Sequence, residues 1–164
     1  MKRITIATAL AVAAATALAA TAGAHFMSAT ESVADSGALV VAFDEAGLGN
    51  QNVNYTLTAQ ATAVYACFNG GGNHPAASNK VGPSALSASL SNVQPKNGRV
   101  IASITVGPPA NTTLSCPSGQ TLALACVSYT DVTLTDTTNQ VDADGVLSGT
   151  TSRTFVSGKG ISCS

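Results

Sequence analysis

The alternation of apolar and polar residues over positions 53–68 is the feature that most constrains the fold of this chain. Odd positions carry apolar or small side chains, whereas the even positions up to Thr62 carry Asn, Thr or Gln. Because successive side chains of a β-strand point to opposite faces, the pattern predicts a long strand with one buried and one hydrated face. From Val64 onward both faces are apolar, which predicts that this end of the strand is covered on both sides.

Shorter β signals recur along the chain between turns. An apolar run at 38–43 is closed by Asp44, Glu45 and Gly47, and the pair Asn97-Gly98 supplies the positive φ angles that a tight hairpin requires. The segment before this pair and the segment after it are therefore expected to pair as a hairpin. Further strands are expected at 86–90, 99–106, 121–135, 152–156 and 160–163.

Two segments depart from simple alternation. The inward face of 121–135 switches parity near Ser128 and Tyr129, which a β-bulge or a crossing between sheets explains. Residues 25–37 lack clear periodicity and are expected to form a loose or partly docked entry segment. Since no helical spacing occurs after the first two dozen residues, the sequence predicts an all-β, antiparallel β-sandwich, immunoglobulin-like, with seven to eight strands.

The first 24 residues have the composition of a secretory signal peptide. Lys2 and Arg3 precede an apolar run of small residues that is too short for a stable membrane span, and Ala22-Gly23-Ala24 offers an A-x-A cleavage site. We therefore expect cleavage before His25, export to the extracellular space, no membrane attachment afterwards, and a single secreted domain over 25–164.

Charge excludes one class of partner. Once Lys2 and Arg3 are removed, five basic residues face eight acidic ones, and no basic stretch is present. Nucleic-acid binding needs a positive surface that neutralises phosphates, so nucleic acid is not an expected partner. The sequence calls for no cofactor.

The four cysteines are expected to form two disulfides, because the exported chain enters an oxidising compartment. Four cysteines allow three pairings, which the sequence leaves open. We favour Cys67–Cys116 with Cys126–Cys163, since the second bridge would fasten a C-terminal tail that otherwise frays. A metal site is not expected, because C-x-x-C spacing and nearby histidines are both lacking.

Five phrases give the chain a family resemblance. They are YACFNGGGN at 65–73, AASNK at 76–80, SCPSGQ at 115–120, VSYTDV at 127–132 and LTDTTN at 134–139. Together they resemble small secreted proteins of high-GC Gram-positive bacteria and some fungi. The resemblance implies secretion and a β fold, but no activity. It also implies that Cys67 and Cys116 form the recurring pair and that Cys126 and Cys163 are an added one.

The loop expected at 69–80 is the best candidate for a binding site. Backbone N–H groups of its glycines, together with amide and imidazole side chains, would suit an anion or a sugar hydroxyl. The alternative is a turn-rich connection that is packed by its own backbone. The candidate binding residues are Asn69, Gly70, Gly71, Gly72, Asn73 and His74.

Catalytic patterns are weak. The chain has no G-x-S-x-G elbow, and His74 is the only histidine away from the N-terminus. A calcium loop at Asp142-Ala143-Asp144-Gly145 fails, because Gln140 and Thr151 occupy the first and last ligand positions. Asp131 and Asp136 are expected to be hydrated or turn-capping carboxylates.

We therefore expect a non-enzymatic protein with an extracellular structural or binding role toward an unidentified protein or glycan. One alternative is an inhibitor of a protease or another extracellular enzyme, acting through a rigid loop at 114–119. A second alternative is an enzyme with an unrecognised site.

Overall fold

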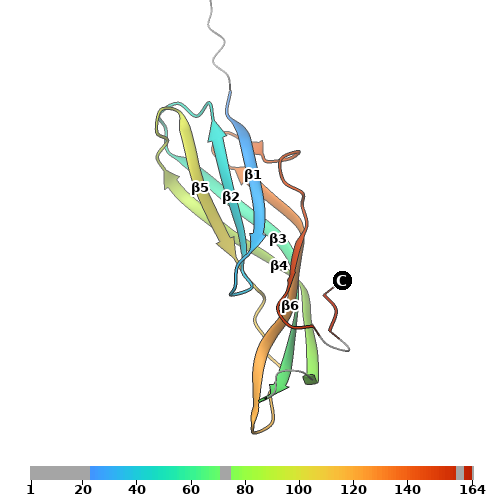
Figure 1. Cartoon of the computed structure of the whole chain (residues 1–164). Coiled ribbons are helices and arrows are strands. Elements are labelled where there is room, and N and C mark those ends of the chain that lie inside the picture. The colour runs from blue at the N-terminus through green and yellow to red at the C-terminus, as the bar shows by residue number, and fades with distance from the viewer. Residues whose placement is uncertain (1–22, 71–74, 158–160, 164) are drawn as a thin grey trace, which may run out of the picture.

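The computed structural model describes residues 23–70, 75–157 and 161–163 and confirms the predicted β-sandwich. A three-stranded sheet has the order β1-β2-β5, and a five-stranded sheet has the order β4-β3-β6-β7, with β8 also paired to β6 (Figure 1). Every strand pair is antiparallel. The strands are β1 (His25–Val33), β2 (Leu39–Ala46), β3 (Val53–Asn69), β4 (Pro75–Val93), β5 (Arg99–Val106), β6 (Gln120–Asp136), β7 (Val141–Asp142) and β8 (Thr151–Thr154).

The predicted alternation places the core between the two sheets. Odd residues of β3, from Val53 to Ala63, are buried, whereas the even residues from Asn54 to Thr62 are exposed or half-buried. Leu39, Val41 and Phe43 of β2 are buried in the same apolar cluster. Burial of such side chains contributes roughly 25 cal/mol for each Å² removed from water, so this interface supplies the main driving force for folding.

The strands β3, β4 and β6 continue below the three-stranded sheet as an arm, visible in Figure 1. The arm consists of residues 63–69, 75–81 and 120–126. On one face, the loop 107–119 is tied down by the Cys67–Cys116 disulfide and by the Tyr65 hydroxyl, which donates to the Pro109 carbonyl oxygen at 2.8 Å.

The C-terminal segment covers the other face of the arm. It forms the Cys126–Cys163 disulfide, and its apolar residues Val156 and Ile161 pack on a small cluster that includes Val64 and Phe68. Both the favoured cysteine pairing and the two-sided cover of this end of the strand are therefore confirmed. In the part of the chain that the structure describes, no second sheet covers the arm, and the two disulfide-held segments lie on its faces instead.

The predicted irregularity in the long strand β6 is present as two bulges. One extra residue, Ala125, lies where Val64 pairs with Cys126 and Tyr65 pairs with Leu124. The second bulge places Asp131 and its neighbour opposite a single residue of β3, and Asp131 has a φ of 51°. The two bulges lie on either side of Ser128 and Tyr129. The predicted irregularity is therefore a bulge, as expected, but it lies a few residues from the predicted position.

Four boundary predictions were wrong. Residues 25–33 form β1 and pair along β2, because the backbone edge of β2 needs a partner even where β1 has little apolar pattern. The strand expected to close at Asp44 continues to Ala46. The strand β4 begins at Pro75, so the expected loop at 69–80 is shorter, and residues 161–163 form no strand.

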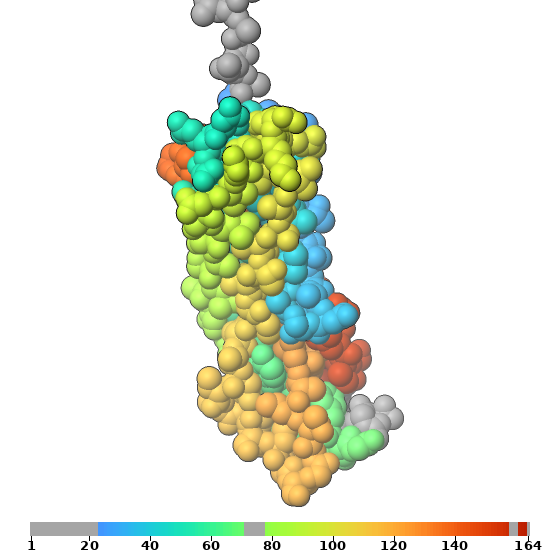
Figure 2. Space-filling model, turned by 90° about the vertical axis from the view of Figure 1, so that its left-hand side faces the viewer, coloured from blue at the N-terminus to red at the C-terminus, as the bar shows by residue number. Residues whose placement is uncertain are grey.

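The Asn97-Gly98 turn is confirmed locally, but it does not join a hairpin. Asn97 and Gly98 have φ values of 53° and 72°, and Lys96 and Arg99 exchange backbone hydrogen bonds. However, β4 belongs to the five-stranded sheet and β5 to the three-stranded one. Figure 2 shows β4 and β5 side by side on the molecular surface, where the turn carries the chain from one sheet to the other.

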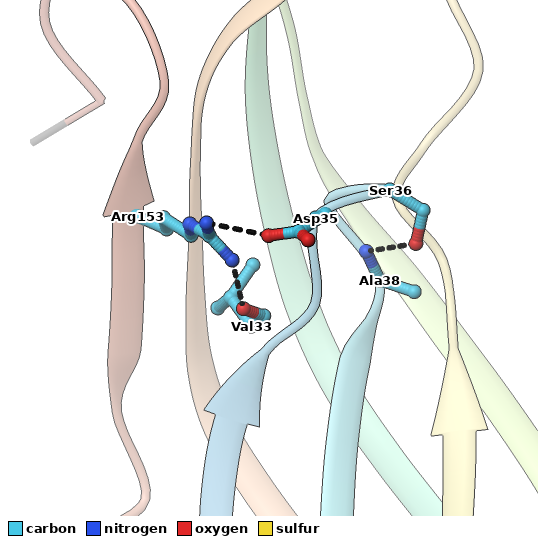
Figure 3. Close-up of polar contacts among 5 residues, drawn as sticks. All are labelled: Val33, Asp35, Ser36, Ala38 and Arg153. Carbon is cyan, nitrogen blue, oxygen red and sulfur yellow. Dashed lines mark hydrogen bonds and ion pairs between the residues drawn. The ribbon is translucent and has the colours of Figure 1, made fainter.

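Arg153 of β8 fastens the two sheets on another side (Figure 3). Its guanidinium donates to the Val33 carbonyl oxygen at 2.9 Å and to the Asp35 carboxylate at 2.6 Å, both at the end of β1. The same guanidinium lies 4.9 Å from the ring centroid of Phe155. Because the Asp35 side chain is exposed, we attribute this contact mainly to orientation and little to stability.

No helix long and apolar enough to cross a membrane occurs among the described residues.

Candidate functional site

The loop that the sequence singled out is only partly described. Asn69 is the last residue of β3 at the end of the arm, and Gly70 follows it in a turn; both are exposed. Gly71, Gly72, Asn73 and His74 lie outside the described residues. The binding prediction for this loop therefore stays a prediction.

The outer face of the five-stranded sheet carries a broad array of hydroxyl groups, which we call the hydroxyl face. Its members alternate with core residues along β3, β4 and β6, and they are exposed or half-buried. They line up across the strands, as in the row Ser89–Thr56–Thr135 and the next row Ser87–Thr58–Thr133. The hydroxyl face consists of Thr56, Thr58, Gln60, Thr62, Ser87, Ser89, Ser128, Thr130, Thr133 and Thr135.

Cross-strand hydrogen bonds hold part of this array in place. The hydroxyl groups of Thr58 and Thr133 are 2.7 Å apart, and those of Thr56 and Ser89 are 3.4 Å apart. Such pairs stabilise neighbouring strands by roughly 0.2–1 kcal/mol each. Each hydroxyl both donates and accepts, so the paired groups keep hydrogen-bonding capacity for a ligand.

A shallow hollow of about 430 Å³ lies in the middle of the hydroxyl face. Its polar wall comes from three strands, and Asp131 reaches it from the bulge in β6. A positive φ is uncommon for a residue other than glycine, and such residues cluster at functional sites. The lining residues are Thr58, Ala59, Gln60, Ala85, Leu86, Ser87, Asp131 and Thr133.

This set of groups suits a neutral, polyhydroxylated ligand. The exposed Asp131 carboxylate accepts hydrogen bonds, the Gln60 amide donates and accepts, and the hydroxyl groups do both. Thr58 and Thr133 add methyl groups, and Leu86 adds apolar surface. From the sequence, Asp131 was expected to be a hydrated or turn-capping carboxylate; the hollow could not be predicted, because its lining residues come from three strands that are far apart in the chain.

A second unusual place is a buried acidic cluster made by Glu45 of β2, Tyr55 of β3 and Asp136 of β6. All three side chains have 0 % exposure. Both oxygens of the Glu45 carboxyl lack a hydrogen-bond partner of normal geometry among the described residues, and so does the Tyr55 hydroxyl. Aromatic rings surround the cluster, because Tyr55 lies 4.6 Å from Phe43 and 6.4 Å from Phe26 between ring centroids.

Burial has a large electrostatic effect on this cluster. The pKa of Glu45 rises to about 7, mainly because burial desolvates the carboxylate; the Tyr55 hydroxyl opposes this rise, the nearby Asp136 charge contributes to it, and His25 opposes it. Burial and the Glu45 carboxyl also raise the pKa of Tyr55. This burial could not be predicted from the sequence, because Asp44 and Glu45 have the pattern of the polar end of a strand.

Asp136 has the capping role that was expected, although its side chain is buried. Its Oδ1 accepts from the backbone N–H groups of Thr138 and Asn139 at 2.8 and 3.0 Å. Its Oδ2 accepts from the Asn139 amide at 2.6 Å. Asp136 thus accepts three hydrogen bonds, whereas the Glu45 carboxyl and the Tyr55 hydroxyl have no such partner among the described residues.

Among the described residues, no group of three or more His, Cys, Asp or Glu side chains is arranged to hold a metal ion.

Comparison with known proteins adds no assignment: no protein-family model matches the chain, and neither a curated protein nor a solved structure is detectably similar to it.

Proposed function

We propose that this protein is a secreted, non-catalytic binding module that holds a neutral glycan on its hydroxyl face. The observation that carries the proposal is the hollow around Asp131, where a carboxylate, an amide and three hydroxyl groups converge. Sugar hydroxyls are recognised by side chains that donate and accept hydrogen bonds. The hydroxyl face contains no Lys, Arg or Glu, so an uncharged ligand fits it better than an anionic one.

Secretion is part of the same proposal. The sequence of residues 1–24 supports removal of a signal peptide, and the two disulfides are compatible with an oxidising compartment. Expression in a secreting bacterial host, followed by intact-mass measurement of the protein in the medium, tests this. A product that begins at His25 and has lost four cysteine hydrogens is the expected result, whereas retention inside the cells contradicts it.

Binding is tested by sedimentation with insoluble polysaccharides: chitin, cellulose, starch and purified bacterial cell walls. Asp131→Asn keeps a residue that tolerates positive φ and removes the charged acceptor. Thr133→Val keeps the shape of the side chain and removes its hydroxyl group. Loss of a charge-assisted hydrogen bond of about 1.5–3 kcal/mol predicts affinity at least tenfold weaker for Asp131→Asn.

Asp144→Asn is the matched control, because Asp144 is exposed in a turn and does not line the hollow. Retained binding by this control with loss in both hollow variants supports the proposal. Equal binding by all four proteins, or no binding to any of the polysaccharides, contradicts it.

The inhibitor alternative has one favourable observation, which is the tethering of the loop 107–119. Besides the disulfide, Asn111 accepts from the Leu114 backbone N–H at 3.0 Å and donates to the Leu114 carbonyl oxygen at 2.8 Å. A loop held in this way binds without a large ordering cost. However, Leu114 is half-buried, so the loop lacks a fully exposed apolar side chain for an enzyme pocket there. Stoichiometric inhibition in a titration against secreted serine proteases would favour this function over glycan binding.

A further inference from the structure

The buried acidic cluster lies beside the point where the expected mature chain begins. In the register of β1 and β2, Phe26 lies opposite Glu45 and His25 lies opposite Ala46. Directly opposite residues have Cβ atoms roughly 4.5–5.5 Å apart. His25 precedes Phe26, so its backbone nitrogen lies one residue along β1 from the position opposite Glu45, at the same end of the sheet.

None of the groups that face Glu45 neutralises it among the described residues. Asp136 on β6 is another carboxylate, Tyr55 on β3 is a neutral phenol, and Val100 on β5 is apolar. On β1, the His25 side chain is exposed and contacts the Gly23 carbonyl oxygen at 2.8 Å. Arg99, which is next to Val100, pairs with Asp44 on the outer side of the sheet.

Two carboxyl groups buried without a cation are costly, because desolvation is not offset by an opposite charge. Asp136 is stabilised by its three donors, but Glu45 has none. A buried carboxyl in this position needs either a proton or a cation. Cleavage of the leader before His25 would create a cation at this place.

We propose that the α-ammonium group released at His25 by signal-peptide cleavage docks on the Glu45–Asp136 pair and completes the fold of the mature protein. The proposal depends on the cleavage position and is independent of glycan binding. In the uncleaved chain the same nitrogen is an uncharged amide, so Glu45 has no cation there. Processing thus stabilises the extracellular form relative to its precursor.

The test compares two chains made from cleavable fusions, one that begins at His25 and one that begins at Gly23. Each chain is made twice, once with Glu45 and once with the Glu45→Gln substitution. Two extended residues move the amine by about 7 Å, away from the acidic pair. At pH 7.5 we expect the His25 chain to unfold on the order of 5 °C above the Gly23 chain. With Glu45→Gln this difference should vanish. Ala24 itself packs against the core, so the extension changes the melting temperature for a second reason. The quantity that tests the proposal is therefore how much the melting-temperature difference between the His25 and Gly23 chains changes when Glu45 is replaced by Gln.

A second measurement does not depend on stability. The pKa of the α-amine in the His25 chain, followed by pH-dependent labelling of the N-terminus, should lie above the usual range of about 7.7–8.0 and return to it with Glu45→Gln. An equal thermal difference with and without Glu45, or an α-amine pKa that Glu45→Gln does not change, would overturn the proposal.

Discussion

The burial of Glu45 predicts that stability depends on pH in a direction opposite to that of most surface carboxylates. The relevant chain carries a short extension before Gly23, so that no α-amine lies near Glu45. The pKa of Glu45 rises from 4.5 to about 7 in the folded protein, mainly through desolvation. The folded state therefore holds a proton that the unfolded state releases above its lower pKa. The contribution of Glu45 to stability is fully present below pH 4.5 and is lost as the pH rises through about 7.

The size of this effect follows from the shift. A change of roughly 2.5 pKa units at about 1.4 kcal/mol each gives a loss on the order of 3 kcal/mol between pH 4.5 and 8. Glu45→Gln keeps the size of the side chain and cannot ionise, so its free energy of unfolding should lack this decrease. At pH 8 the variant should be more stable than the parent by up to about 3 kcal/mol.

Urea unfolding at several pH values measures these free energies, with far-UV circular dichroism as the signal because the chain has no Trp. Because the charge of the rest of the chain also changes with pH, the quantity of interest is the difference in free energy of unfolding between parent and variant. Asp144→Asn, at an exposed turn, is the control and should follow the parent. Parallel curves for the parent and Glu45→Gln would refute the reasoning.

Three further changes should lower stability. Replacing Cys126 and Cys163 by Ser removes the bridge that holds the C-terminal segment on the arm and should cost about 2–4 kcal/mol, measured by urea unfolding. Tyr129→Phe removes the buried hydrogen bond to the Gly37 carbonyl oxygen at 2.7 Å, and calorimetry should report a loss of about 1–2 kcal/mol at constant disulfide content. Gly82→Ala brings a Cβ into a clash with the Ala61 backbone carbonyl oxygen of β3 at a φ of +110°, so the melting temperature should fall well below that of the parent. An unchanged melting temperature would contradict the strained geometry.

Much of the architecture was predictable because it depends on local pattern. Alternation over β3 specified which side chains are buried, and the apolar stretch after Val64 indicated that the arm is covered on both faces. The tail argument led to the correct partner for Cys163. These inferences succeeded because a strand's two faces are set by the parity of its own residues.

The candidate site was less accessible to such reasoning. The hollow gathers Gln60, Ser87 and Asp131 from three different strands, and the position of Asp131 depends on a bulge that the sequence located only approximately. The strand β1 has little pattern of its own, and it forms because β2 offers an unpaired edge.

The sequence alone determined that the chain forms β-strands with one hydrated face, has two disulfides and carries few charges. Only the tertiary structure decided that Glu45 is buried and that β4 and β5 belong to different sheets. The physical reason is that parity tells which way a side chain points, whereas its solvation depends on what the rest of the chain places above it. For Glu45 those neighbours are Tyr55 and Asp136, which belong to the other sheet and meet it only in the folded sandwich.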